Sequence, residues 1–340
     1  MIAWRKFFGA FLLLSSVIAG CIAPARVETT PTPCADGLTD QQAATLSSLQ
    51  KVDAHPLYTM RYIGAYDTRQ SFAAPVVERA WGCSLFAALG DPNGMFYGRN
   101  FDWEHSPAIL LFTEPPNGYA SVAMVDIAYL GFIGARANNI ADLPLAERRA
   151  LLSAPLLPFD GMNARGLVVG MAAVPPGNVP RDPSKPTVDS VRIIREMLDC
   201  AATVDEAVAI MQRHNIDFTG GPPIHYLIAD ATGRATLVEF YQGKTFVIPN
   251  ETPWHQATNF LRRSVDDAQG KCWRYDTLAQ RLTASAGRVS GQDALKLLQD
   301  VSQKETQWSI VYGMNTGKIT VTMGRNYANT HTFDLKMESK

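Results

Sequence analysis

The sequence predicts an α+β fold in which mostly antiparallel sheets are covered by helices on the outside. Three observations favour this class. Segments of strand character come in runs, short turns rich in Gly, Pro, Asn and Asp connect them, and pairs of helical segments separate the runs. No strand–helix–strand unit carries a GxGxxG or P-loop motif, so nothing in the chain supports nucleotide binding.

The first half of the fold begins with helical spacing over residues 39–52, after the capping pair Thr39-Asp40. Residues 83–103 then read as a β-hairpin, because an apolar run and its return strand flank the turn-forming residues GDPNG. Further strands are expected over residues 107–126, around a PPNG turn. A turn followed by an apolar strand is expected over residues 161–174.

The second half alternates helices with hairpin-connected strands. Thr203 and Glu206 form the signature of a capping box at the start of one helix. The expected elements are helices over 188–200 and 204–213, a strand meander over 225–249, helices over 273–286 and 291–300, and a closing hairpin over 307–324.

The N-terminus reads as an export signal. Arg5 and Lys6 precede an apolar stretch that is too short to span a bilayer, and the stretch ends Ile18-Ala19-Gly20-Cys21. Small residues before a cysteine resemble the lipobox of bacterial lipoproteins, in which the cysteine is lipidated and becomes the mature N-terminus. We therefore expect a signal peptide over 1–20, a Pro- and Thr-rich tether over 21–38, and an extracytoplasmic protein anchored to a membrane through Cys21. The alternative is an ordinary secretory signal with an incidental cysteine.

Composition excludes several classes of partner. The formal net charge is −1 and no basic stripe or block occurs, so nucleic acid is not an expected partner. The histidines and cysteines are scattered, with no CxxC or HExxH spacing. We accordingly expect neither a metal nor a cofactor.

Cys83 opens the apolar strand of the first hairpin, directly after Gly82. A cysteine there is ordinarily a small core residue, and a nucleophilic one needs a base that generates thiolate. Cleavage of the Gly82–Cys83 bond would give Cys83 a free α-amino group with a pKa near 8, which suits that task. The hairpin returns Arg99 and Asp102 beside this strand. They lie on opposite faces, so a bulge or the strand's end must intervene if both reach Cys83; a surface ion pair is the alternative.

These residues resemble the N-terminal-nucleophile cysteine hydrolases of the choloylglycine hydrolase superfamily. That group includes penicillin V acylases, bile salt hydrolases, isopenicillin-N acyltransferases and acid ceramidase. Its mature chains begin with a cysteine, followed by an arginine and an aspartate with the spacing seen here, 16 and 19 residues after Cys83.

Further motifs extend the resemblance to about residues 83–325. The turn DGMNARGL resembles a family turn and implies that Asn163 is an oxyanion donor. The segment ATNF implies the same role for Asn259. The segment CWRYDTL puts Arg274 at the place of a second active-site arginine, for which Arg262 and Arg263 compete.

The resemblance implies a four-layer αββα sandwich, with a propeptide over 39–82 and a catalytic domain over 83–340. Self-cleavage between Gly82 and Cys83 is expected, because the nucleophile does not follow the initiator Met and Gly82 tolerates a strained backbone. The expected activity is cofactor-free hydrolysis of linear N-acyl amides through a thioester, and a small N-acyl amide is the expected partner.

Several alternatives remain open on the sequence alone. The same residues suit an acyltransferase, and a catalytically silent binding lipoprotein would keep the same fold. After cleavage the two fragments are expected to stay together as a heterodimer, and a higher oligomer is open. Cys34 either pairs with Cys200 or Cys272, or all three cysteines are unpaired.

Overall fold

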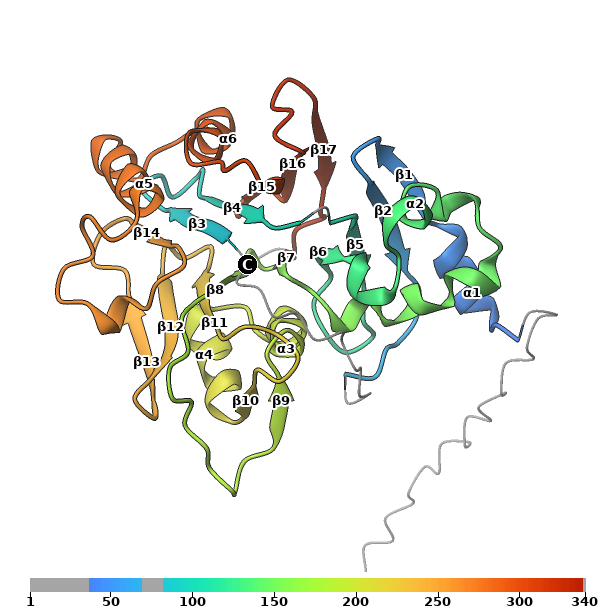
Figure 1. Ribbon diagram of the computed structural model, residues 1–340, viewed down its shortest axis with the longest axis horizontal. Helices are drawn as coiled ribbons and strands as arrows, with labels where there is room; N and C mark the ends of the chain where they lie inside the picture. The colour runs from blue at the N-terminus through green and yellow to red at the C-terminus, as the bar shows by residue number, and fades with distance from the viewer. Residues whose placement is uncertain (1–36, 69–81, 105, 339–340) are drawn as a thin grey trace, which may run out of the picture. The chain divides into compact units, whose positions relative to one another are not determined.

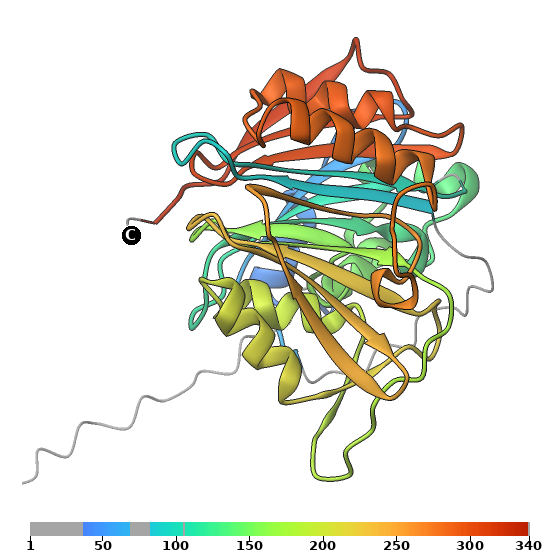
Figure 2. The ribbon, with the colours of Figure 1, turned by 90° about the vertical axis from the view of Figure 1, so that its left-hand side faces the viewer.

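A computed structural model describes residues 37–68, 82–104 and 106–338 of the chain. The expected signal peptide, the lipidation site Cys21, Cys34 and most of the tether lie outside the described residues. Figure 2 shows four layers, with helices above one sheet, a second sheet beneath it, and further helices below. The expected α+β class with an αββα sandwich is confirmed.

The first sheet has six strands, all paired antiparallel, in the order β14-β3-β4-β15-β16-β17. The expected hairpins β3–β4 and β15–β16 lie in it, whereas β14 and β17 were not expected. The bounds are β3 (Gly82–Ala88), β4 (Phe96–Asp102), β14 (Trp254–Ala257), β15 (Thr306–Gly313), β16 (Lys318–Met323) and β17 (Thr330–Asp334).

The second sheet has nine strands in the order β1-β2-β5-β6-β7-β8-β11-β12-β13, and only the pair β2–β5 is parallel. The bounds are β1 (Gln50–Asp53), β2 (Leu57–Tyr62), β5 (Ala108–Thr113), β6 (Ser121–Asp126), β7 (Asp160–Asn163), β8 (Val168–Ala173), β11 (Ile224–Ala229), β12 (Ala235–Tyr241) and β13 (Lys244–Pro249). A separate parallel pair joins β9 (Thr187–Asp189) to β10 (Asn215–Asp217).

Helices cover the outer faces of both sheets (Figure 1). The pair α5 (Trp273–Ala284) and α6 (Gly291–Asp300) packs on the six-stranded sheet. The pair α3 (Arg192–Cys200) and α4 (Val204–Gln212) packs on the nine-stranded sheet. Thr203 and Glu206 form the expected capping box of α4. The remaining helical segments are α1 (Asp40–Ser47), η1 (Ile127–Leu130), α2 (Gly134–Ala137), η2 (Ile140–Asp142), η3 (Leu145–Leu156) and η4 (Arg262–Ser264).

The main core lies between the two sheets. Strands β5, β6 and β8 are buried along their whole length, because helices or the other sheet cover each face. In β3 and β4 the odd-numbered residues face the nine-stranded sheet. The even-numbered residues face α5 and α6, where Phe86 packs with Leu278 and Leu298. This alternation decides which side chains meet Cys83.

The segment before Cys83 belongs to the same compact unit as the rest of the described chain. The expected helix over 39–52 is shorter than expected: α1 ends at Ser47, and Gln50–Asp53 instead pairs with β2. Strand β2 pairs with β5 over six residues, and its Leu57 and Tyr58 are fully buried. Within the described part of the chain, no helix combines the length and the apolar character needed to cross a membrane.

Candidate active site

Cys83 is the second residue of β3 and lies opposite Phe101 of β4. Its side chain has no exposed surface. Because odd-numbered residues of β3 face inward, the thiol points toward the nine-stranded sheet, where Arg99 also points. The Nη2 atom of Arg99 lies 3.6 Å from the Cys83 Sγ atom. The hairpin therefore brings a buried cation to a buried thiol.

Arg99 is held in place by a second set of contacts. Its guanidinium forms a buried ion pair with Asp160 of β7, and Tyr312 of β15 donates a hydrogen bond to the same carboxylate. Arg99 also donates to the main-chain oxygen of Met171 in β8, at 3.3 Å. Its guanidinium carbon lies 5.0 Å from the centre of the Phe101 ring. These partners fix the cation beside the thiol, and they exclude the alternative that Arg99 forms a surface ion pair.

Asp102 lies at the end of β4 on the opposite face, paired with Gly82. Its carboxylate accepts hydrogen bonds from Thr306, at 2.6 Å, and from Gln303. A Cβ atom on Gly82 would come within 2.8 Å of the Asp102 Cβ and 2.7 Å of the Gln303 Nε2. Asp102 therefore faces the main chain at the Gly82–Cys83 bond, whereas Arg99 faces the thiol.

Asn259 and Arg274 hold the main chain of Cys83. The Asn259 Oδ1 atom accepts from the Cys83 N–H at 2.8 Å. Arg274, near the start of α5, donates to the Cys83 main-chain oxygen, to the Ser84 hydroxyl at 3.0 Å and to Asn259 Oδ1 at 2.9 Å. Its Nη1 atom lies 3.8 Å from Asp102 Oδ2. Five of the six expected side chains thus form one cluster, with Gly82 at its edge.

Arg262 and Arg263 do not take the place expected of Arg274. Their main-chain N–H groups donate to Glu239 at 2.8 and 2.9 Å, and Arg262 also donates to the Val265 oxygen at 3.2 Å. Arg274, in contrast, donates to the main-chain oxygen of Cys83.

Asn163, the sixth expected side chain, forms its hydrogen bonds outside the cluster. Its side-chain nitrogen donates to the oxygens of Leu198 and Ala201 at the end of α3, at 3.0 and 2.7 Å. Its side-chain oxygen accepts from the N–H groups of Arg165 and Leu167, at 3.1 Å each. Since its polar groups are engaged in the β7–β8 turn, Asn163 acts as a structural residue that ties this turn to α3.

Burial dominates the electrostatics of the cluster. It raises the pKa of the Cys83 thiol, while Arg99 opposes that shift by favouring the thiolate. Burial also raises the pKa of Asp102, against the hydrogen bonds from Thr306 and Gln303. Burial alone would lower the pKa of Arg99. The interactions with Cys83 and Asp160 outweigh this effect, so the pKa of Arg99 is raised. Burial therefore favours the protonated form of the Cys83 thiol, which lies next to the buried Arg99 cation.

Sequence reasoning missed the residues that support the cluster. Asp160 belongs to a recognised motif, but its pairing with Arg99 is visible only once β4 and β7 lie in facing sheets. Gln303 and Thr306 lie on the segment after α6, about 200 positions from Asp102. No local signal connects residues so distant in sequence.

Two further cysteines lie in the part of the chain that the structure describes. Cys200 is exposed, Cys272 is half-buried, and both are free thiols. Their expected partner Cys34 lies outside the described residues. Across residues 37–68, 82–104 and 106–338, no group of three or more His, Cys, Asp or Glu side chains is arranged to hold a metal ion.

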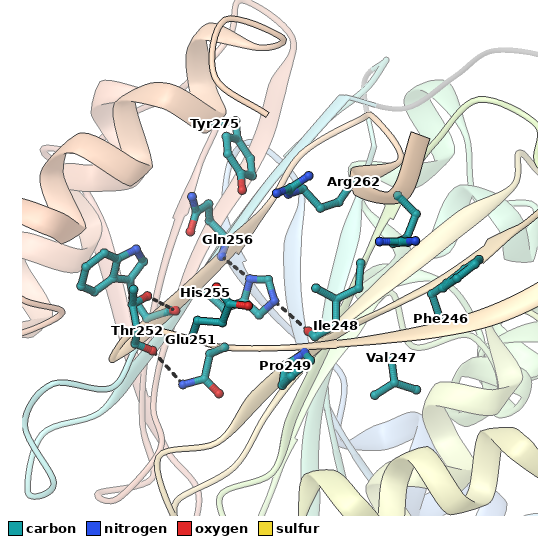
Figure 3. A pocket seen from close by; sticks show the side chains of 13 residues that line it. Phe246, Val247, Ile248, Pro249, Glu251, Thr252, His255, Gln256, Arg262 and Tyr275 are labelled. Atoms are coloured by element: carbon teal, nitrogen blue, oxygen red, sulfur yellow. Dashed lines mark hydrogen bonds between the residues drawn. The ribbon is translucent and has the colours of Figure 1, made fainter. Parts of the chain in front are cut away.

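A polar cleft of about 510 Å³ lies beside the turn that carries Arg262 and Arg263 (Figure 3). It lies between β13 and β14, and Arg262, Arg263 and Tyr275 line one part of it. Two of these residues closely follow Asn259 in sequence, and Tyr275 directly follows Arg274.

Comparisons with known proteins agree with this geometry. A family model described as acyl-coenzyme A:6-aminopenicillanic acid acyl-transferase matches residues 158–328. Penicillin V acylase from Agrobacterium tumefaciens is similar in structure, with a TM-score of 0.52 and 15% identity over 74% of this chain and 86% of that one. Two mutant forms of conjugated bile acid hydrolase from Clostridium perfringens give TM-scores of 0.53 and 0.52. They are 15% and 14% identical over 76% of this chain and 93% and 94% of theirs. At such identities the structural likeness concerns the fold, which is that of the N-terminal-nucleophile hydrolases.

Proposed function

This chain belongs to the acyl-coenzyme A:6-aminopenicillanic acid acyl-transferase family, and from that premise we propose that it is a self-processing amidase that hydrolyses linear N-acyl amides. The nucleophile is the thiol of Cys83. One observation carries the proposal: the thiol lies beside the Arg99 guanidinium, while Asn259 and Arg274 bind the main chain of the same residue. A core cysteine needs none of these contacts.

Maturation begins with attack of the Cys83 sulfur on the carbonyl carbon of Gly82. The C–N bond to Cys83 breaks, a C–S bond forms, and the thiol proton ends on the released amine. Water then hydrolyses the thioester, which leaves a Gly82 carboxylate and restores the thiol. The close approach of Gly82 to Asp102 and Gln303 supports this cleavage point, since a larger residue would collide with both.

Cleavage creates the base that catalysis needs. The new α-amino group of Cys83 has an ordinary pKa near 8, so a useful fraction is neutral at physiological pH. Asp102 faces this part of the main chain and stabilises the ammonium form. Arg99 stabilises the thiolate. Asp102 thus acts on the α-amino nitrogen of Cys83, and Arg99 acts on its sulfur.

In the catalytic cycle, the α-amine accepts the thiol proton and the thiolate attacks the substrate's carbonyl carbon. The resulting ammonium protonates the nitrogen of the leaving amine, and the C–N bond breaks to give a thioester. The α-amine then accepts a proton from water, whose oxygen attacks the thioester. The carboxylic acid leaves and the thiol is restored.

Two donors suit the oxyanion. The first is the side-chain nitrogen of Asn259, which lies 2.8 Å from the Ala173 oxygen. The second is the main-chain N–H of Ala173. In an antiparallel strand the N–H and C=O of one residue point the same way, and the Ala173 oxygen points toward Asn259. Each such donor typically contributes roughly 3 kcal/mol to transition-state stabilisation.

The two fragments stay associated after cleavage in this proposal. Strand β2 lies inside the nine-stranded sheet between β1 and β5, and its Leu57, Tyr58 and Met60 side chains are buried. Withdrawing it would expose apolar surface and unpaired main-chain groups on β5. The fragment that ends at Gly82 thus remains a structural subunit, and we propose that it anchors the enzyme to the outer face of a membrane through Cys21.

Acyl transfer to an amine is the second candidate, favoured by the description of the matching family model. It uses the same residues and differs only in the acceptor. Adding a primary amine to the reaction separates the two: a hydrolase forms carboxylic acid as the main product, whereas a transferase forms a new amide.

A panel of N-acyl amides with graded acyl chains tests the proposed function. We expect amine release by the wild type and none by Cys83→Ala, with Cys200→Ser as the matched control that retains activity. Equal amine release by the wild type and Cys83→Ala, or none by either with any substrate, would contradict the proposal.

A further inference from the structure

A buried pair of polar side chains, His225 and Glu239, joins the nine-stranded sheet to the segment that carries Asn259. His225 lies on β11 and Glu239 on β12, and neither has more than 1% of its surface exposed. The His225 Nδ1 atom lies 2.9 Å from Glu239 Oε1, and its Nε2 atom lies 2.8 Å from the main-chain oxygen of Thr258. A buried ion pair often adds little stability compared with apolar residues of similar size. The pair is therefore better explained by what it positions.

The bond to Thr258 fixes the peptide plane that leads into Asn259. A carbonyl oxygen only accepts hydrogen bonds, so the Nε2 atom of His225 is the donor. Because the peptide bond is planar, the Thr258 C=O and the Asn259 N–H turn together. Rotation of this plane would move the Asn259 side chain away from the Cys83 nitrogen, which lies 2.8 Å from Asn259 Oδ1. His225 thus acts on Asn259 through the main chain.

Glu239 holds the same segment at its other end. Its two carboxylate oxygens accept the main-chain N–H groups of Arg262 and Arg263, at 2.8 and 2.9 Å. Burial works against the Glu239 carboxylate, but the bond to His225 and the main-chain donors outweigh burial and lower its pKa. The pair therefore holds residues 258–263 at both ends, and Asn259 lies between them.

The contacts of Asn259 leave little room for displacement. Its side-chain oxygen accepts from the Cys83 N–H and from Arg274, and its side-chain nitrogen donates to the Ala173 oxygen at 2.8 Å. The nitrogen that Asn259 contacts becomes the base in the proposed mechanism. Misplacing a group of this kind by about 1 Å can cost roughly 100-fold in rate.

We propose that His225 and Glu239 are positioning residues that hold Asn259 against the nitrogen of Cys83. The proposal rests on the proposed function, in which that nitrogen is the base. His225 acts through the Thr258 carbonyl, whereas Glu239 orients the His225 ring and holds the far end of the segment. Both residues support the reaction through Asn259 and not through contact with the reacting atoms.

Two substitutions of His225 separate its two hydrogen bonds. A glutamine amide nitrogen lies near the position of Nε2, and an asparagine amide nitrogen lies near that of Nδ1. His225→Gln therefore keeps the donor to Thr258 and loses the contact with Glu239, and His225→Asn does the reverse. We expect His225→Asn to lower kcat for an accepted amide roughly 100-fold with KM unchanged, and His225→Gln to stay close to the wild type. Because each variant loses one hydrogen bond, their urea midpoints should be similar.

The same two substitutions of His214 are the matched control. His214 also lies between a main-chain oxygen, that of Ile210 at 3.0 Å, and a carboxylate, that of Glu196 at 3.6 Å. It follows α4 on the outer side of the nine-stranded sheet, so both variants should keep the wild-type kcat. Equal kcat values in the two His225 variants, or kcat values that follow their urea midpoints, would overturn the positioning role and leave the amidase intact.

Amide hydrogen exchange tests the positioning without any activity. In the uncleaved Cys83→Ala chain, exchange of the main-chain N–H at position 83 reports its hydrogen bond to Asn259. The N–H should exchange roughly tenfold faster when His225→Asn is added, and at an unchanged rate when His225→Gln is added. If neither His225 variant folds, Glu239→Gln replaces them. Its amide nitrogen cannot accept a main-chain N–H, so exchange at position 83 should again be faster. Unchanged exchange in the folded variants refutes the proposal, even if the wild type hydrolyses no amide.

Discussion

The Nη2 atom of Arg99 lies 3.6 Å from the Sγ atom of Cys83, and neither side chain has exposed surface. A cation this deeply buried is costly unless it is compensated. Asp160 supplies the compensating charge from the facing sheet. Arg99 thus lies between the Asp160 carboxylate and the Cys83 thiol.

Replacing Arg99 tests its effect on the thiolate. Arg99→Gln keeps a hydrogen-bond donor but removes the charge, so the thiol pKa should rise further and kcat/KM for an accepted amide should fall roughly 100-fold. The pH dependence of Cys83 alkylation by iodoacetamide reports the pKa directly. Arg136→Gln, at an exposed ion pair, is the control. An unchanged alkylation profile in Arg99→Gln would show that Arg99 does not act on the thiol.

The Asp160 contacts predict a graded loss of stability. Asp160→Asn leaves Arg99 buried without its anion and should cost about 3–5 kcal/mol of unfolding free energy. Tyr312→Phe removes one hydrogen bond to the same carboxylate and should cost about 1–2 kcal/mol. Urea denaturation measures both. If Tyr312→Phe were the more damaging change, Asp160 would not be the main partner of Arg99.

Gly82 should be required for self-cleavage because of its close neighbours. A Cβ atom there would lie 2.8 Å from the Asp102 Cβ, so Gly82→Ala must displace the scissile bond and should slow cleavage at least tenfold. Gly221→Ala is the matched control, since a Cβ there meets nothing within 4 Å. Gel analysis of freshly refolded chains measures cleavage. Equal cleavage rates in Gly82→Ala and the wild type would mean that the close packing around Gly82 does not affect self-cleavage.

Self-cleavage should speed up with rising pH. Burial raises the pKa of the Cys83 thiol, so the thiol is protonated at neutral pH in the uncleaved chain. The reactive thiolate therefore increases about tenfold per pH unit until the pH passes the ordinary thiol range near 8.5. Chains refolded between pH 6 and 9 should show this slope. A rate that levels off below pH 8 would indicate a lowered thiol pKa and contradict the assignment.

The elements that begin or end at a recognisable turn or helix cap were predicted correctly from local sequence patterns. Residues close in sequence determine the β3–β4 hairpin and the capping box at Thr203. They also determine the spacing of Arg99 and Asp102 after Cys83. The helix over 39–52 was predicted too long, because pairing with β2 converts Gln50–Asp53 into a strand. A tertiary contact of that kind overrides local helical spacing.

Beyond the β3–β4 hairpin, only the family resemblance pointed to site residues, and it brought Asn259 and Arg274 to the cluster but not Asn163. Asn163 was expected to donate to the oxyanion, but packing of α3 beneath β7 engages its nitrogen with Leu198 and Ala201. Asp160, Gln303 and Thr306 support the site across sheets or from distant segments. Their roles follow from the layering of the sandwich, which no local pattern contains.

The most direct test of the account is the intact mass of the purified protein. The account predicts a fragment that begins at Cys83 and ends at Lys340, held with its N-terminal partner under native conditions and absent from Cys83→Ala. A full-length wild-type chain, uncut at Gly82–Cys83 and without an acyl adduct on Cys83 after incubation with amide substrates, would contradict it.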